Sequence, residues 1–260
     1  MEEAITTANQ PSNLQPLPAT RSVQSLTSNV QPPASNFKER TIEDLLRAFT
    51  RPDLAEIVAL TLRVSGIALL ISALIGVPLG ALIGLARYTG KGATRAVLYT
   101  GMGLPPVVVG LTVYLLMSRS GPFGSLGWLF TPYAMIFAQV LIALPMMAAL
   151  TMTSVESVSP ELRRQVLALG ATRSQLAWTV LREARIGVTA AVVAAFGAII
   201  SEVGAVMLVG GNIAGQTRVL TTSIVLDTRQ GDFSLALALG VILLTITFLV
   251  NVGLMRLQGK

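Results

Sequence analysis

The residues that usually carry out chemistry are scarce in this chain of 260 residues. It has no histidine and no cysteine, which excludes disulfides, zinc sites built from these residues and histidine-based catalytic triads. Only 12% of the residues are charged, and the few acidic ones do not cluster as a metal site requires. The nearest approach to a phosphate-binding loop, between Gly84 and Gly92, is one residue too long and has glycine where a hydroxyl is needed. We therefore expect no catalysis, cofactor or metal in this chain.

One acidic residue, Glu202, lies well inside an apolar run, beside Ser201. An ionised group at membrane depth costs about 2.5–3.5 kcal/mol on insertion scales, so we expect Glu202 to face protein or water. It is either a pathway or gate residue or one partner of a structural hydrogen bond between helices. Ser201 and the chain at Pro105-Pro106 are the partners we expect for it.

Apolar residues make up 52% of the chain and occur in long blocks, a pattern typical of membrane-spanning helices. Pro105 and Pro106 fall inside one block and should break its helix, which is tolerated where the break faces protein or a water-filled path. Gly76, Gly80 and Gly84 form one helix stripe suited to close helix packing. Five spans are predicted, at about 60–86, 96–117, 132–152, 186–209 and 235–255.

The N-terminal region differs from the rest of the chain. Residues 1–36 are rich in Ser, Thr, Pro, Gln and Asn, and we predict a disordered polar tail. Residues 37–54 show the spacing of an amphipathic helix near the membrane, and the membrane domain follows at 55–256. Lys and Arg are concentrated in the first and third connections and at the C-terminus, which predicts that these are cytoplasmic. Five spans then place the N-terminus outside, although the tail itself is basic. The alternative is that part of the tail packs along the inner face of the membrane.

The third connection, about residues 153–185, is long and patterned. Ser159 is a good helix N-cap before Pro160, and Gly170 stands where a left-handed residue should end the helix. A second helix should start near Thr172 or Ser174 and continue into the fourth span. The first helix carries an apolar stripe, which either packs on the protein's own spans or docks into a groove of another cytoplasmic protein. The stripe consists of Leu162, Val166 and Leu169.

The segment SPELRRQVLALGATRSQLAWTVL resembles the "EAA loop" of type I ABC importer permeases, in which this loop forms the coupling helix that enters a cleft of the ATP-binding subunit. Gly170 matches the glycine of that loop. The chain departs from the family in having Gln165-Val166-Leu167 where Glu-Ala-Ala is usual. The resemblance implies that the ATPase-coupling residues are Glu161, Leu162, Arg163, Arg164, Gln165, Val166, Leu169, Gly170, Ala171 and Thr172.

Two further segments narrow the resemblance. GLPPVVVGLTVYLLMSRSGPFGSLG and ISEVGAVMLVGGNIAGQTRVLTTSIVL are similar to segments of molybdate and tungstate permeases, and TRQGDFSLALALG favours the tungstate branch. The three segments occur in the family's order on a five-span layout. Together with the proline break and the intramembrane acid, these segments contain our candidate residues for the translocation path or gate, which are Pro105, Pro106, Ser201, Glu202 and Gly204.

The resemblance implies an all-α membrane protein with the five-helix bundle of a type I ABC importer permease. It implies transport of tungstate or molybdate across a bacterial inner membrane. The partners implied are a second permease copy, a dimer of cytoplasmic ATP-binding subunits and an extracytoplasmic oxyanion-binding protein, besides membrane lipid and without nucleic acid. ATP would be hydrolysed on the separate subunit.

The connection after the fourth span offers the groups that an oxyanion prefers, namely backbone amides, hydroxyls and arginine. These residues meet either the released oxyanion or the surface of its binding protein, or they form an ordinary solvated loop. They are Asn212, Gly215, Thr217 and Arg218.

Other transporters remain as alternatives. A type I ABC permease for sulfate, phosphate or an amino acid would share the same architecture. An ion-coupled secondary transporter would normally show inverted repeats and several ionisable residues inside the membrane, and this chain has one clear example. A membrane-embedded enzyme would need a catalytic set, which the sequence lacks.

Overall fold

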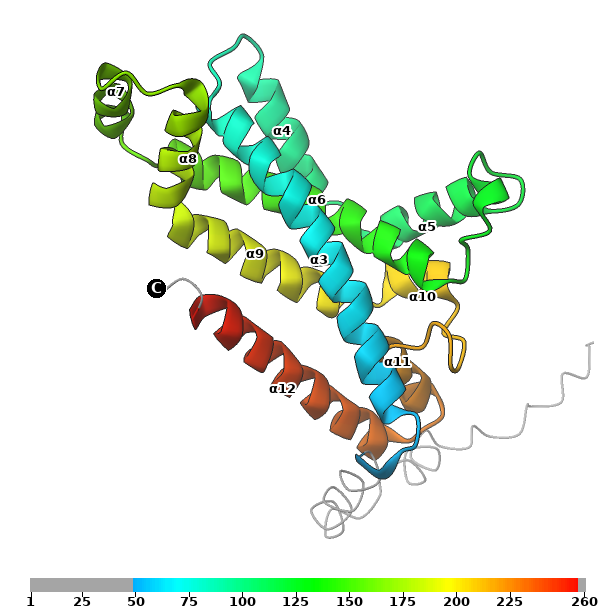
Figure 1. The fold of residues 1–260 in the computed structure, drawn as a ribbon. Helices are drawn as coiled ribbons and strands as arrows, with labels where there is room; N and C mark the ends of the chain where they lie inside the picture. Colours follow the sequence, from blue (N-terminus) through cyan, green and yellow to red (C-terminus); the bar gives the residue numbers. More distant parts are fainter. Residues whose placement is uncertain (1–48, 257–260) are drawn as a thin grey trace, which may run out of the picture. The chain divides into compact units, whose positions relative to one another are not determined.

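The computed structural model describes residues 49–256. The predicted disordered tail and most of the predicted amphipathic segment lie outside the described residues. Within the described part the chain is helical and contains no strand, as the all-α prediction requires (Figure 1). The helices are α3 (Leu54–Leu85), α4 (Lys91–Met102), α5 (Pro106–Met117), the short 3-10 helix η2 (Gly124–Leu126), α6 (Pro132–Glu156), α7 (Pro160–Ala168), α8 (Arg173–Glu183), α9 (Arg185–Ile200), α10 (Gly204–Gly210), α11 (Leu220–Arg229) and α12 (Phe233–Arg256).

Helices α3 and α6 run side by side in the same direction and form the centre of the bundle. The stripe of Gly76, Gly80 and Gly84 faces α6. A Cβ atom added at Gly80 would lie 2.4 Å from the Ala148 carbonyl oxygen, and one at Gly76 would lie 2.8 Å from Met147 Cβ. The backbones approach this closely because the glycines have no side chains.

Three helices, α3, α6 and α12, are long and apolar enough to cross a membrane by themselves. Two further candidates are bent pairs, α4 with α5 at 91° and α8 with α9 at 70°. The helix after Gly170 was expected to run into the fourth span, but it is interrupted: α8 ends at Glu183, and α9 begins at Arg185 after the bend at Ala184. Beyond this bend, Gly187 brings the start of α9 against Ser154 of α6, where a Cβ would lie 2.3 Å from the Ser154 hydroxyl oxygen.

The segment predicted as the fourth span, 186–209, is divided into α9 and the short α10. Helix α9 has 16 residues, which is about 24 Å of helix against a hydrocarbon core of roughly 30 Å. The chain then breaks at Ser201–Val203, and α10 carries it on to Gly210.

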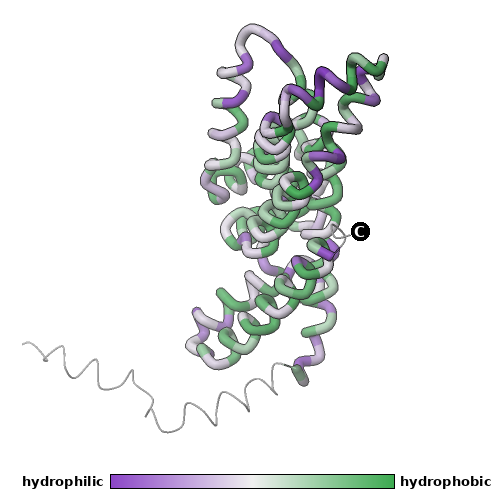
Figure 2. The backbone as a smooth tube through the Cα atoms, turned by 90° about the vertical axis from the view of Figure 1, so that its left-hand side faces the viewer, coloured by the Kyte–Doolittle hydropathy of each residue, from purple (hydrophilic) through white to green (hydrophobic). Residues whose placement is uncertain are grey.

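Ion pairs join the helices at both ends of the bundle. At one end, Lys91 and Arg95 of α4 pair with Glu156 at the end of α6, at 3.0 and 2.8 Å. At the other end, Arg51 before α3 bridges Asp53 and Asp227 of α11, both at 3.1 Å. The connections α3–α4 and α6–α7 therefore lie at the same end of the bundle. Figure 2 shows mainly apolar residues along the helices and many hydrophilic ones around these two connections.

Candidate functional site

The break between α4 and α5 is set by its two prolines. Pro105 has extended backbone (ψ 121°), as expected for a residue that precedes proline, and Pro106 occupies the first turn of α5, where its missing N–H is harmless. The carbonyl of Pro105 accepts the amide of Val108 at 2.9 Å. The chain thus changes direction by 91° and keeps most of its nearby backbone groups paired.

The break between α9 and α10 is held by side chains. The Glu202 carboxylate accepts the amide of Ala205 at 2.8 Å, and the Thr221 hydroxyl donates to the Glu202 carbonyl at 3.2 Å. Gln139, buried in α6, donates through Nε2 to the Ile199 carbonyl at 3.0 Å. These bonds replace the helix bonds that the break removes.

The two breaks lie against each other. A Cβ added at Gly204 would lie 2.7 Å from Cγ2 of Val107, the residue after Pro106, and one at Gly110 would lie 2.5 Å from the Ala205 Cα. The structure therefore brings the predicted path residues Pro106, Glu202 and Gly204 into one region where α5 packs on α10 (Figure 1).

The hydrogen bonds expected from Glu202 to Ser201 or to the proline break are not formed. Glu202 uses its carboxylate within its own segment, on Ala205. The Ser201 side chain is exposed and donates to the Gly197 carbonyl at 2.7 Å. Ser201 therefore lies beside the region of the breaks without joining its hydrogen-bond network.

In the loop after α10, a residue predicted to meet the anion instead stabilises the turn. Thr217 is completely buried; its hydroxyl donates to the Gly210 carbonyl at 2.6 Å and accepts the Ile213 amide at 2.9 Å. Asn212 and Gly215 adopt positive φ values of 51° and 71°. The Thr217 hydroxyl is thus used within the turn.

Arg218 lines a cavity of about 430 Å³ between this loop and the start of α3. Arg63 lines the same cavity, but so do Asp53 and Glu56. The charges of the two acidic groups therefore balance those of the two arginines. A cavity without net positive charge is poorly suited to binding a free anion.

The loop that resembles a coupling helix is built from three local hydrogen-bond motifs. The Ser159 hydroxyl caps α7 by accepting the Leu162 amide at 3.2 Å. At its other end Gly170 has φ 81°, and the amides of Gly170 and Ala171 bond to Leu167 and Val166, at 3.0 and 3.3 Å, which is a Schellman motif. Thr172 and Gln175 form a capping box that starts α8. The sequence rules for caps therefore explain the whole turn.

One end of the apolar stripe of α7 packs on the bundle, and the other end is exposed. Leu162 packs against the bundle, in a cluster with Val155 of α6 and Val180 of α8. Leu169 is 87% exposed, and Val166 is intermediate. The base of α7 is thus fixed on the protein itself, and its tip is free for a partner.

The charged residues of α7 also divide into two groups. Arg164 pairs with Glu161 at 2.8 Å on the exposed side, where Gln165 is also exposed. Arg163 reaches back and donates to the Val155 carbonyl near the end of α6.

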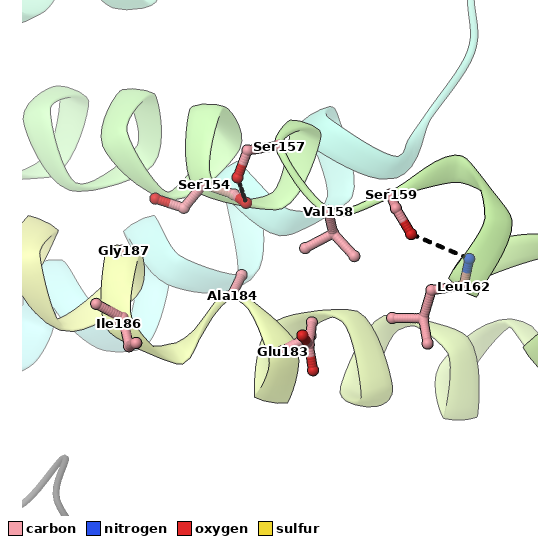
Figure 3. Close-up of a pocket in the computed structure, with 9 residues that line it drawn as sticks. All are labelled: Ser154, Ser157, Val158, Ser159, Leu162, Glu183, Ala184, Ile186 and Gly187. Atoms are coloured by element: carbon pink, nitrogen blue, oxygen red, sulfur yellow. Dashed lines mark hydrogen bonds between the residues drawn. The ribbon is translucent and has the colours of Figure 1, made fainter.

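A cavity of about 420 Å³ lies where the base of α7 meets the end of α6 and the α8–α9 bend (Figure 3). It is lined by serines 154, 157 and 159, with Glu183 on the opposite side. All three serine hydroxyls are bonded to nearby backbone groups. Ser154 donates to the Leu150 carbonyl and Ser157 to the Ser154 carbonyl, and Ser159 accepts the Leu162 amide. This hollow lies between the base of α7 and the α8–α9 bend.

Sequence reasoning missed several of these contacts. Gln139 could have been noticed as a polar residue within the predicted third span, because such residues usually bond across helices. The Arg163 bond to Val155 and the Arg51 bridge to Asp227 give no local signal, since their partners depend on the fold.

The profile of the family described as "Binding-protein-dependent transport system inner membrane component" matches residues 76–258. A probable anion ABC transporter permease protein of Haloferax volcanii is 44% identical over 203 residues, 76% of this chain and 88% of the relative. The tungstate uptake system permease protein TupB of Peptoclostridium acidaminophilum is 41% identical over 85% of this chain and 96% of its own length.

Solved structures support the same fold. A bacterial ABC transporter that imports alginate superposes with a TM-score of 0.68 at 17% identity, over 91% of this chain and 92% of the other. The methionine ABC transporter gives a TM-score of 0.66 at 19% identity, over 81% of this chain and the whole of the other chain. At this identity the likeness establishes the fold alone, and that fold is the predicted one.

Proposed function

The chain belongs to the family of binding-protein-dependent transport system inner membrane components, and we propose on this premise that it is the permease subunit of an ATP-driven tungstate importer. The observation that supports tungstate as the substrate is the 41% identity to a tungstate permease over 96% of that protein. The molybdenum permease ModB and the sulfate permease CysT of Escherichia coli are 27% and 26% identical. Tungstate therefore ranks before molybdate and sulfate.

In this proposal two copies of the chain enclose the path, and two ATP-binding subunits lie on the side of α7. The exposed tip of α7 around Leu169 and Gly170 enters the ATP-binding subunit. The contact between α5 and α10 forms the path or gate, with Glu202 as a positioning group. Its carboxylate holds the start of α10 and, being negative, does not serve as an anion ligand.

The proposed orientation has the N-terminus outside and the α3–α4 and α6–α7 connections in the cytoplasm. Arg87, Lys91 and Arg95 in the first region and five arginines between 163 and 185 in the other support this side. The turn that carries Arg218 then faces the extracytoplasmic binding protein. Its balanced charges favour contact with a protein surface over capture of free oxyanion.

The mechanism is alternating access. Closure of the ATP-binding subunits on ATP moves both α7 helices, and the bundle opens outward to the loaded binding protein. The chain hydrolyses nothing itself, because the energy comes from the separate subunit.

Uptake of radiolabelled tungstate, molybdate and sulfate tests this function in cells that lack their own systems and express this chain with its ATP-binding and binding-protein subunits. We expect tungstate uptake that molybdate inhibits weakly.

The variant Gly170→Val should abolish tungstate uptake, because a β-branched residue does not tolerate φ 81°. Gly231→Val is the matched control, since Gly231 has φ 83° in the α11–α12 connection, away from the coupling loop. Uptake of sulfate alone would reject the substrate assignment, and failure of a tagged chain to co-purify an ATPase would reject the transporter class.

A further inference from the structure

Helix α8 packs on the bundle but runs in a different direction from α9. It is bent by 70° from α9 at Ala184 (Figure 1). Helix α9 has no charged residue after Arg185, whereas α8 contains Arg173, Arg182 and Glu183. A membrane-crossing helix is tilted by about 20° on average. If α9 crosses the membrane, α8 therefore runs close to the membrane plane.

The two faces of α8 have opposite surroundings. Its inner face packs on the bundle through Leu176 and Val180, and Val180 is fully buried. Trp178 lies on the opposite face and is 70% exposed. Arg182 follows Trp178 by four residues and is exposed on the same side. A large amphipathic ring and a guanidinium thus share the free face of the helix.

The bend itself is basic. Arg182 and Arg185 line an open hollow of about 460 Å³ together with Thr179, Glu183 and Ile186. Neither arginine takes part in an ion pair within residues 49–256. The single acidic group, Glu183, leaves this hollow with a net positive charge.

We propose that α8 is an interfacial anchor whose free face binds anionic phospholipid. Trp178 would lie at the level of the lipid headgroups, where tryptophan is enriched, and Arg182 and Arg185 would bind lipid phosphates. Trp178 is six residues from Ala184, about 9 Å along the helix, which keeps it near the interface. The exposed Leu167 and Leu169 at the far tip of α7 leave a separate apolar surface for the cytoplasmic partner.

The chain contains only two tryptophans, which makes the position of Trp178 measurable. In the full-length Trp128→Phe variant, reconstituted in phosphatidylcholine–phosphatidylglycerol vesicles, all tryptophan emission comes from Trp178. Lipids brominated close to the headgroup should quench it strongly, and aqueous iodide should quench it weakly. Trp178→Phe, which keeps Trp128, is the control for non-specific quenching. Strong iodide quenching without bromolipid quenching would overturn the proposal, and protection by added ATP-binding subunit would then assign this face to that subunit.

Charge recognition needs a second measurement. Phosphatidylglycerol titrated into the Trp128→Phe protein in neutral detergent should change Trp178 emission, and Arg182→Gln or Arg185→Gln should raise the half-saturating concentration roughly fivefold each. Arg164→Gln removes an exposed arginine from α7 and should leave the titration unchanged. Equal titrations for all variants would contradict lipid-phosphate binding. The proposal uses the membrane orientation proposed above, but this readout requires no substrate, so an incorrect tungstate assignment would not affect it.

Discussion

Glu202 is the acidic residue that lies within a predicted span, and its role follows from the hydrogen bond that its carboxylate accepts. Its carboxylate oxygen accepts the Ala205 amide and so fixes the start of α10 beside α5. Glutamine keeps an acceptor oxygen at this position, whereas alanine does not. We therefore expect Glu202→Ala to lower the free energy of unfolding by about 1 kcal/mol and Glu202→Gln to lower it by less than half as much. Thermal unfolding of the detergent-solubilised protein measures both, and equal losses would contradict the capping role.

Gln139 is the second residue whose side chain holds a break. It donates from inside α6 to the carbonyl of Ile199. Gln139→Leu should destabilise the protein by about 1 kcal/mol and slow uptake, because the α9–α10 break loses its bond to α6. Ser201→Ala is the control at the same break, since Ser201 bonds only within α9 and its loss should be nearly neutral. Stability and initial uptake rate are the measurements; a neutral Gln139→Leu would show that the break holds without α6.

At the scale of elements, the α3–α6 pair depends on one stripe of glycine. Gly80→Ala would place Cβ 2.4 Å from the Ala148 carbonyl oxygen, so the two helices must separate, at a cost of about 1–3 kcal/mol. Gly66 lies on the same helix with nothing within 4 Å of an added Cβ, and Gly66→Ala should leave stability unchanged or slightly raised. Thermal unfolding of both variants measures these changes in stability. Equal changes for Gly80→Ala and Gly66→Ala would mean that helix propensity, and not packing against α6, determines the effect of alanine in α3.

The termini of α3 and α11 are joined by charges whose pKa values move in opposite directions. Hydrogen bonding from Arg51 lowers the pKa of Asp53, and burial raises the pKa of Asp227 despite the same arginine. Asp227 therefore contributes stability that is fully present below its ordinary pKa and is lost as pH rises through its raised pKa. Asp53 contributes stability that is present above its ordinary pKa and is lost as pH falls through its lowered pKa.

Asp227→Asn and Asp53→Asn should accordingly show opposite pH trends in unfolding temperature relative to the unmodified protein. The advantage of the unmodified chain over Asp227→Asn should grow as the solution is acidified below neutral pH. Its advantage over Asp53→Asn should shrink below the ordinary pKa of aspartate. Parallel curves for the two variants would contradict the assignment of burial to Asp227 and of the arginine bond to Asp53.

The elements that can be predicted from the sequence are those whose ends are determined by residues close to them in the chain. Ser159, Pro160 and Gly170 define the start and end of α7 because caps and left-handed glycines act within a few residues. The bend at Ala184 was not predicted, because it depends on how Gly187 fits against Ser154 of another helix. The same holds for the burial of Thr217, which looks like a ligand in the sequence and serves the turn in the structure.

At the scale of the whole molecule, the base of α7 has two attachments to the bundle. Leu162 packs into the cluster formed by α6, α8 and the bend, and Arg163 bonds to the Val155 carbonyl of α6. Helix α6 in turn packs on α3, α9 and α10. If a partner moves the tip of α7, we expect the motion to reach α6 through these contacts, and through α6 to reach both sides of the α9–α10 break.

This route predicts a difference between adjacent arginines. Arg163→Gln weakens the bond to α6, and Arg164→Gln removes only an exposed pair with Glu161, which is worth little. In the reconstituted complex we expect Arg163→Gln to lower tungstate uptake per ATP hydrolysed by up to roughly tenfold, because a charge-assisted bond contributes about 1.5–3 kcal/mol, with little change in basal ATP hydrolysis. Arg164→Gln should stay within about twofold of the unmodified complex. Equal uptake per ATP in the two variants would mean that the motion reaches the path through α8 and the bend at Ala184 instead of through α6.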